Sequence, residues 1–586
     1  MAMHPRHVFA ACVPVLAGAL WAAGALSAQA APTEPQDAQD SNALIMTAEI
    51  ALRRDDCGRA ATDYTVAAQR LTSVPLAKRA AEVALGCGQY ETASRAAARW
   101  HQLLPADPAP LHASVQAQLG LYRIDAARNA FQNWLQSSKG APPVSAPKAG
   151  AKATANGNDI VHQVQQLAAE SGVPATLAML RGVQAQPLQS SAGQMALADL
   201  AFDGWNYREA VQYAQRALTS GAERGTAQLV LARAHAGLGE ADAAVAAALA
   251  ARDASPKEQS FADADVLMML GREDEARESL ETLGQNPALK SQAARRLGLL
   301  AFSAGQYDEA SRQFSQLLAD HDSSAVAVYY LAAIAERRDD AGTALRGYQL
   351  LAGTALESAA RMRAATLLYK HAHRPEALKL LAPATDATPA MRVEAEIAQS
   401  QLLSENGEAE QAVARIDDAL ARSPGHPDLL YQKAIVLEKA GHTDASIAQL
   451  ESLYRDRPDD SAIANALGFI LADHNRDLKR AEKLINAALK FEPDNPAILD
   501  SLGWLAYRRG MARAAAPVLE RAFRLDQDAD IGAHWGEVLW SLGEKAKARE
   551  AWSRALVADP DNAAVKAAEE RAGQPQLLSP GTGTSV

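Results

Sequence analysis

A small residue recurs every 32 to 35 residues along most of the chain, and this periodicity constrains the fold more than any other feature. In many repeats a bulky residue, such as Phe314 or Trp552, follows the small residue three to four positions later. A Gly or Ala precedes it at a set distance, as at Gly503 and Gly536. The series runs Ala60, Ala93, Ala127, Ala175, Ala210, Ala244, Ala276, Ala310, Ala344, Ala377, Ala412, Ser446, Ala481, Ala515 and Ala548. Such a period predicts stacked helix-turn-helix units, about 15 of them.

Composition supports an all-α array. A chain of 586 residues is too long for one compact core. Its hydrophobic content is 48% but its aromatic content only 5%, so the apolar fraction is mostly Ala and Leu, which are good helix formers. The net charge of -11 is spread along the chain with Lys and Arg interleaved, which argues against nucleic acid or anionic lipid as a partner.

The first residues differ in composition from the rest. Arg6 supplies a positive start, residues 8–26 are apolar, and Ala28-Gln29-Ala30 is a small-x-small site, so we expect a secretory signal over 1–30 that is cleaved after Ala30. The alternative is an uncleaved membrane anchor. Cys12 lies near the beginning of the apolar stretch rather than after it, which argues against lipidation.

Removal of the signal leaves two cysteines, Cys57 and Cys87. The repeat register places both near helix-helix turns of neighbouring repeats, where a bridge is geometrically allowed. In an oxidising compartment two thiols suggest a disulfide, and two separate thiols remain the alternative.

One interruption of the period divides the chain. Between Ala127 and Ala175 the gap is 48 residues, and residues 137–159 are rich in Pro, Ala, Lys and Gly, which predicts a flexible linker. We therefore expect an N-terminal block at 41–136, a main array at 160–560, a polar capping helix at 561–572 and a disordered tail at 573–586.

No spacing typical of catalysis occurs in the sequence. There is no phosphate-binding loop, no nucleophile elbow and no paired-cysteine metal motif. His371 and His373 fall at an expected turn and have no third ligand nearby, so we interpret them as exposed turn residues. The sequence predicts no cofactor, no metal site and no enzymatic activity.

The segment from Pro493 to Gly510 carries two helical stripes. Leu499, Leu502, Gly503 and Ala506 form one; the other, one residue round the helix, holds the two largest aromatic side chains of the segment and consists of Asp500, Trp504, Tyr507 and Arg508. Two stripes indicate two sets of contacts.

The 34-residue period and its small and bulky positions resemble the tetratricopeptide repeat family. The resemblance implies a right-handed superhelical solenoid in which the first helix of each repeat lines a concave groove that binds partner segments. The second stripe then lies on the groove, and the same register gives the expected partner-binding residues Tyr431, Phe469, Asp500, Trp504, Tyr507, Arg508, Glu537 and Trp540. Trp535 and Trp552 fall in the internal register, where we expect core packing.

Three segments resemble more closely the exported proteobacterial tetratricopeptide proteins that include the lipoprotein partner of the carboxyl-terminal processing protease. The segments are "AEIALRRDDCGRAATDYTVAAQRLTSVPLAKRAAEVALGCGQYETASRAAARWHQLLPADPAP", "YYLAAIAERRDDAGTALRGYQLL" and "ANALGFILADHNRDLKRAEKLINAALKFEPDNPAILDSLGWLAYRRG". This resemblance implies a periplasmic adaptor that binds a processing protease and presents substrates such as cell-wall hydrolases. The chain lacks a lipid-attachment motif and has its own linker at 137–159. The alternative function is a structural scaffold of an envelope machine for pilus assembly, secretion or polysaccharide export.

Overall fold

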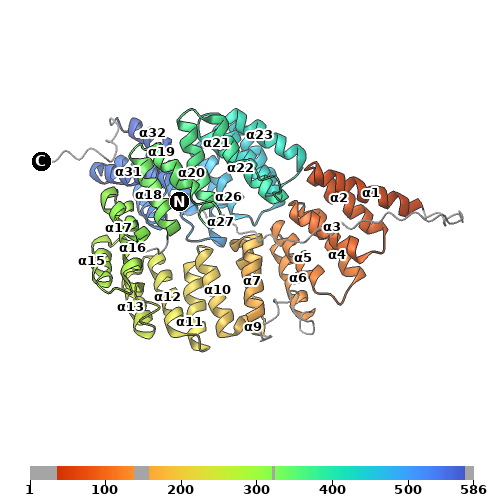
Figure 1. Ribbon diagram of the computed structural model, residues 1–586, viewed down its shortest axis with the longest axis horizontal. Helices are drawn as coiled ribbons and strands as arrows, with labels where there is room; N and C mark the ends of the chain where they lie inside the picture. Colours follow the sequence, from red (N-terminus) through yellow and green to blue (C-terminus); the bar gives the residue numbers. More distant parts are fainter. Residues whose placement is uncertain (1–35, 138–157, 320–323, 574–586) are drawn as a thin grey trace.

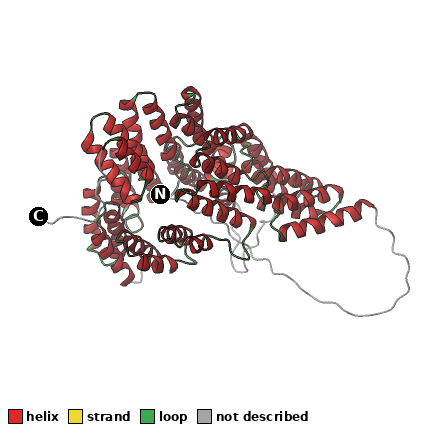
Figure 2. Cartoon of the chain, turned by 90° about the horizontal axis from the view of Figure 1, so that it is seen from above, coloured by secondary structure: helices red, strands yellow, loops and turns green. Residues whose placement is uncertain are grey.

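The computed structural model describes residues 36–137, 158–319 and 324–573, and within these ranges every regular element is a helix (Figures 1 and 2). Most helices form consecutive antiparallel pairs. The pairs are α1 (Gln36–Arg53) with α2 (Cys57–Arg70), α3 (Val74–Gly86) with α4 (Tyr90–Leu103), α5 (Ala109–Gly120) with α6 (Ile124–Ser137), α7 (Asn158–Ser171) with α8 (Val173–Leu180), α10 (Ser191–Asp203) with α11 (Tyr207–Thr219), α12 (Arg224–Leu238) with α13 (Ala241–Ala254), α14 (Ala262–Met269) with α15 (Glu273–Gly284), and α16 (Lys290–Ser303) with α17 (Tyr307–Ala319).

The remaining pairs are α18 (Ser324–Arg337) with α19 (Ala341–Gln349), α20 (Glu357–Lys370) with α21 (Arg374–Leu380), α22 (Pro389–Glu405) with α23 (Ala409–Arg422), α24 (Pro427–Lys439) with α25 (Thr443–Asp456), α26 (Ser461–Asp473) with α27 (Leu478–Phe491), α28 (Pro496–Arg508) with α29 (Ala512–Leu525), and α30 (Ala529–Ser541) with α31 (Lys545–Ala558). Two helices stand outside the pairs: the single turn α9 (Gln186–Gln189) and the terminal α32 (Ala563–Arg571), which packs against α30. The prediction of an all-α helix-turn-helix array is confirmed.

The recurring small residue is the point at which the two helices of a pair meet. All fifteen members of the series lie in the second helix of a pair and are at most 1% exposed. A small side chain there lets the first helix approach closely, and glycines of the first helix do the same. A Cβ on Gly536 would lie 2.1 Å from Nε1 of Trp552, so the closest approach depends on that glycine.

The paired helices wind into a superhelix whose second turn lies against its first (Figure 1). Turns inside earlier pairs contact the loops between later pairs, or the helix ends beside those loops, and we call this line of contacts the seam. Its hydrogen bonds and ion pairs join Asp55 to Arg392, Gln89 to Pro424, Tyr207 to Asp494, Ala236 to Arg524, Arg337 to Ala558 and Lys370 to Asp561. The N-terminal pairs therefore dock on the main array.

Asp494 makes three polar contacts at the seam. Its backbone N–H donates to the carbonyl of Trp205 at 2.9 Å, and its carboxylate accepts the backbone N–H of Tyr207 at 2.9 Å. The guanidinium of Arg521 also pairs with this carboxylate. Asp494 is 5% exposed, so Tyr207 and Arg521 satisfy a carboxylate that has left water.

The structure joins Cys57 and Cys87 by a disulfide, with Cα atoms 5.5 Å apart. The expected signal segment at 1–30 lies outside the described residues, as does the expected linker except for its ends, because α6 closes at Ser137 and α7 begins at Asn158. Of the expected tail only Gly573 is described. Among the described helices none is long and apolar enough to span a bilayer.

Candidate functional site

The expected partner-binding residues come from the first helices of four successive pairs, α24, α26, α28 and α30. Neighbouring first helices contact one another: α26 contacts α28, α28 contacts α30, and α30 contacts α32. Side chains on their shared face can therefore meet although they are more than 30 residues apart. Six of them do, and we call Phe469, Asp473, Asp500, Trp504, Tyr507 and His534 the Trp504 cluster.

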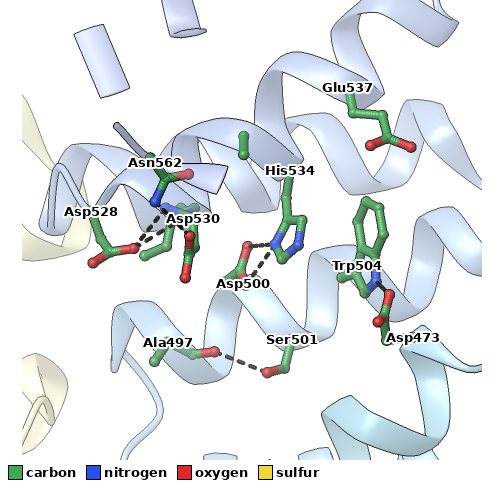
Figure 3. Close-up of polar contacts among 12 residues, drawn as sticks. Asp473, Ala497, Asp500, Ser501, Trp504, Asp528, Asp530, His534, Glu537 and Asn562 are labelled. Carbon is green, nitrogen blue, oxygen red and sulfur yellow. Dashed lines mark hydrogen bonds and ion pairs between the residues drawn. The ribbon is translucent and has the colours of Figure 1, made fainter. Parts of the chain in front are cut away.

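Trp504 contacts side chains from the helices on either side of its own, Asp473 and His534 (Figure 3). Its indole N–H donates to a carboxylate oxygen of Asp473, on α26, at 2.9 Å. Its ring stacks on the imidazole of His534, on α30, with centroids 4.2 Å apart, and lies 5.2 Å from the ring of Tyr507. Only 3% of Trp504 is exposed, so its ring contacts the protein itself rather than solvent.

His534 and Asp500 form a largely buried ion pair beside the Trp504 ring. Nδ1 of His534 lies 2.9 Å and 3.0 Å from the two carboxylate oxygens of Asp500, and the side chains are 14% and 10% exposed. Burial is the largest single influence and lowers the pKa of His534, but the charge and hydrogen bond of Asp500 and the nearby carboxylates together outweigh it, so the pKa is raised above the ordinary value. Asp530 and Asp473 add to the same attraction.

Partly exposed side chains surround the buried centre. Tyr507 and Arg508 are half-buried, and the guanidinium of Arg508 lies 5.9 Å from the Trp504 ring and 3.8 Å from Asp473. Burial raises the pKa of the Tyr507 hydroxyl, and Glu537 adds to the effect. Glu537 itself pairs with Arg571 of α32 at 2.6 Å. We call Tyr507 and Arg508 the rim of the cluster, because their partly exposed side chains lie beside the buried ring of Trp504.

Three expected residues remain: Phe469, which belongs to the cluster, and Tyr431 and Trp540. Phe469 and Tyr431 are half-buried and pack against the core shared by α24 to α28, and the ring of Phe469 lies 5.8 Å from His534. Trp540 stacks on Trp552 at 5.7 Å with the Lys545 ammonium 4.8 Å from its ring. It therefore lies outside the Trp504 cluster.

Both tryptophans expected in the core pack there. Trp552 is fully buried and donates to the carbonyl of Ala533 at 3.2 Å, which confirms the prediction. Trp535 is half-buried with its ring 5.6 Å from Phe523. His371 and His373 are exposed at the turn between α20 and α21, as expected.

Two members of the cluster were absent from the sequence prediction. Asp473 follows Gly468 by five residues, as Arg508 follows Gly503, so the repeat register could have indicated it. His534 precedes Gly536 by two residues, one position away from the one Asp500 holds before Gly503. Nothing in the sequence indicated that it turns toward Asp500, because a one-position offset points to a different part of the helix face.

Ser501 and His534 are not arranged as a nucleophile and its base. Ser501 is next to Asp500 in the sequence, but its hydroxyl donates to the carbonyl of Ala497 in its own helix at 3.0 Å and not to His534 (Figure 3). A nucleophile must reach its base, and this one does not. Across the described ranges no three His, Cys, Asp or Glu side chains gather as metal ligands would. The contacts of the cluster hold the Trp504 ring in one orientation.

The chain is similar to known repeat proteins. It is 31% identical over 209 residues to the TPR repeat-containing protein PA4667 of Pseudomonas aeruginosa, and this match covers 36% of the chain and about a third (35%) of the relative. Among solved structures, the match to a chain of the APC/C hetero-tetramer Cut9–Hcn1 covers 91% of this chain and 96% of that one, at 16% identity and with a TM-score of 0.27. Yeast Tom70 covers 65% and 95% at 14% identity with a TM-score of 0.29.

The repeats themselves are recognised in three places. The tetratricopeptide repeat family matches residues 195–258 and 295–355, which hold α10 to α13 and α16 to α19, and residues 403–468, which run from the end of α22 into α26. These matches fall on the helix pairs whose small and bulky positions define the period. These three segments of the chain therefore carry tetratricopeptide repeats.

Proposed function

We propose that the protein is a non-enzymatic adaptor that is exported to the periplasm and binds a processing protease and its substrates through the face formed by its first helices. Tetratricopeptide repeats bind protein partners, and repeat proteins of this kind are generally non-catalytic. The observation that carries the proposal is the rim of the Trp504 cluster, where Tyr507 and Arg508 stand half-exposed above a buried aromatic base.

Such a rim has the properties of a binding hot spot. Tyr and Arg are enriched where a few residues supply most of the binding energy, and a base that is already packed loses little entropy when a partner docks. Trp504 supplies that base, since its hydrogen bond to Asp473 and its stack on His534 fix the ring in one orientation. The direct contact then falls to Tyr507 and Arg508, while the partner-binding role of Trp504 itself remains a prediction.

Two features support export. The first 30 residues have the pattern of a cleavable signal. The disulfide between Cys57 and Cys87 is a bond that persists in oxidising compartments and is rare in the cytosol. The protease as partner rests on the resemblance of the three quoted segments to exported proteobacterial adaptors.

The test is crosslinking and affinity capture of the tagged protein from the cell envelope, identified by mass spectrometry. Tyr507→Ala/Arg508→Ala removes the rim and leaves Trp504 packed. Met511→Ala/Arg513→Ala is the matched control, because both side chains are exposed at the next turn of the same pair. Recovery of a processing protease and its substrates, lost with the rim variant and kept with the control, supports the proposal.

A different result would favour a scaffold. Recovery of one fixed membrane assembly at constant stoichiometry, with no difference between the rim variant and its control, would contradict both the adaptor function and the choice of face. Retention of the protein in the cytosolic fraction with its first 30 residues attached would contradict export.

A further inference from the structure

The disulfide lies at the N-terminal end of the seam. Cys57 opens α2 and Cys87 follows α3, so the bond ties the turn of the first pair to the turn of the second. Both cysteines are 2% exposed. The residue after each cysteine is a glycine, and both glycines face the same loop of the later array, Ser423 to His426.

The approach between these turns and that loop is close. A Cβ on Gly58 would lie 2.8 Å from Cδ of Pro424, and a Cβ on Gly88 would lie 2.5 Å from Nε2 of His426. Gly88 also has a φ of +65°, which favours glycine independently of the contact. The loop therefore fits only when both turns keep their present relative position, and the disulfide is the covalent link that sets this position.

Polar contacts surround the fitted loop. Gln89 donates to the carbonyl of Pro424 at 3.0 Å. Asp55 accepts from Nε of Arg392 at 2.7 Å and lies 3.8 Å from Nε of Arg422. All these residues belong to the turns or to the helix ends beside the loop, so a shift of either turn would break several contacts at once.

The first two pairs have a core of mostly small side chains. Their core is made largely of alanines, with Tyr64, Val83 and Trp100 as its larger buried members. Alanine buries little apolar area, and along the array the first pair has a neighbouring pair on one side only. A crosslink that closes a loop of 30 residues is therefore a large part of what fixes their geometry.

We propose that the Cys57–Cys87 disulfide is a redox-sensitive latch on the superhelix. With the bond intact, the turns at Gly58 and Gly88 hold the loop at Pro424 and His426, and the first turn of the superhelix is closed onto the second. A dithiol reductant supplies two electrons and two protons, the S–S bond becomes two thiols, and the reductant is oxidised to its own disulfide. The two pairs then separate from the loop.

Closure of the superhelix is a property of the chain itself, so this proposal does not depend on whether the rim of the Trp504 cluster binds the partner proposed above.

His426 provides a local reporter of the latch. It is 6% exposed, its Nδ1 has no hydrogen-bond partner, and burial lowers its pKa. Opening of the latch returns this imidazole to water and its pKa toward the ordinary value.

The test is hydrogen–deuterium exchange of the full chain with and without dithiothreitol, with the redox state of Cys57 and Cys87 verified by alkylation and peptide mass spectrometry. We expect exchange of peptides covering residues 423–428 to accelerate on the order of tenfold or more on reduction. Peptides from α28 should not change. The variant Cys57→Ser/Cys87→Ser should behave like the reduced protein without added reductant.

A second variant separates opening of the seam from loss of the bond. Asp55→Ala keeps the disulfide and removes the carboxylate that Arg392 and Arg422 share, so it should raise exchange of the same peptides in the oxidised protein. Unchanged protection of residues 423–428 once both thiols are shown to be free would overturn the proposal. So would equal acceleration in α28, because it would mean general unfolding and not release of the latch.

Discussion

Trp504 and His534 stack with ring centroids 4.2 Å apart and an interplanar angle of 23°, and this contact joins two repeats that are neighbours in the superhelix. The other edge of the indole reaches the preceding repeat through its hydrogen bond to Asp473. One side chain thus ties α26, α28 and α30 together. In a solenoid each repeat is stabilised mainly by its neighbours, so contacts of this kind carry stability along the array.

Replacement of Trp504 by Ala should destabilise the C-terminal repeats by about 3 to 5 kcal/mol, because it empties a buried site and leaves the Asp473 carboxylate without the indole N–H. Trp504→Phe keeps most of the ring and should cost less. The midpoint of urea-induced loss of helical circular dichroism measures both effects. Equal midpoints for the wild type and Trp504→Ala would mean that the ring is not packed as described.

The ion pair between His534 and Asp500 should make stability depend on pH. The pKa of His534 is raised in the folded protein, so its stabilising contribution is fully present below the ordinary histidine value of about 6.5 and is lost as the pH rises through the folded pKa. The urea midpoint of the wild type should therefore fall between pH 6 and pH 9 more than that of Asp500→Asn. NMR titration of the His534 ring gives the pKa directly, and a value below 6.5 would contradict the prediction.

The sequence allowed the repeats to be placed but not the superhelix. Every small residue of the series lies where two helices cross, because helix packing depends on local volume at a fixed spacing. The contact of Asp494 with Trp205 and Tyr207 spans more than 280 residues, and it depends on the sum of small rotations between repeats. No local pattern encodes that sum.

The candidate site, too, could be predicted from the sequence only in part. The register brought Trp504, Tyr507 and Arg508 to one face and could have added Asp473. It did not show that Trp504 is covered, because that depends on the side chain contributed by the next helix. His534 provides the cover, and its orientation is set by Asp500 through a hydrogen bond that periodicity does not contain.

Asp494→Ala should loosen the seam. The substitution removes the buried carboxylate and leaves the guanidinium of Arg521 and the N–H of Tyr207 without this partner, at a cost of about 2 kcal/mol for lost hydrogen bonds to a charged group. Small-angle X-ray scattering should show a larger radius of gyration than in the wild type. Asp418→Ala removes an exposed carboxylate of α23 and is the control. A radius that matches the wild type in both variants would mean that the seam is held elsewhere.

Two glycine substitutions should act in opposite directions. In Gly536→Ala the new Cβ would lie 2.1 Å from Nε1 and 2.4 Å from Cδ1 of Trp552, a ring that is fully buried and cannot move aside without disturbing α31. Overpacking of this kind costs about 1 to 3 kcal/mol. Gly86 ends α3, and a Cβ added there would meet no atom within 4 Å, so Gly86→Ala should stabilise the protein by about 0.5 to 1 kcal/mol through the lower entropy of the unfolded chain.

Thermal unfolding of the two glycine variants beside the wild type measures the difference. Gly536→Ala should also change the near-ultraviolet circular dichroism of the tryptophans, since it displaces the stack of Trp540 on Trp552, whereas Gly86→Ala should leave that signal unaltered. If Gly536→Ala were as stable as Gly86→Ala, α30 and α31 would not pack as closely at Gly536 and Ala548 as the structure shows. Close crossing at a glycine and an alanine would then not be what sets the spacing of the repeats.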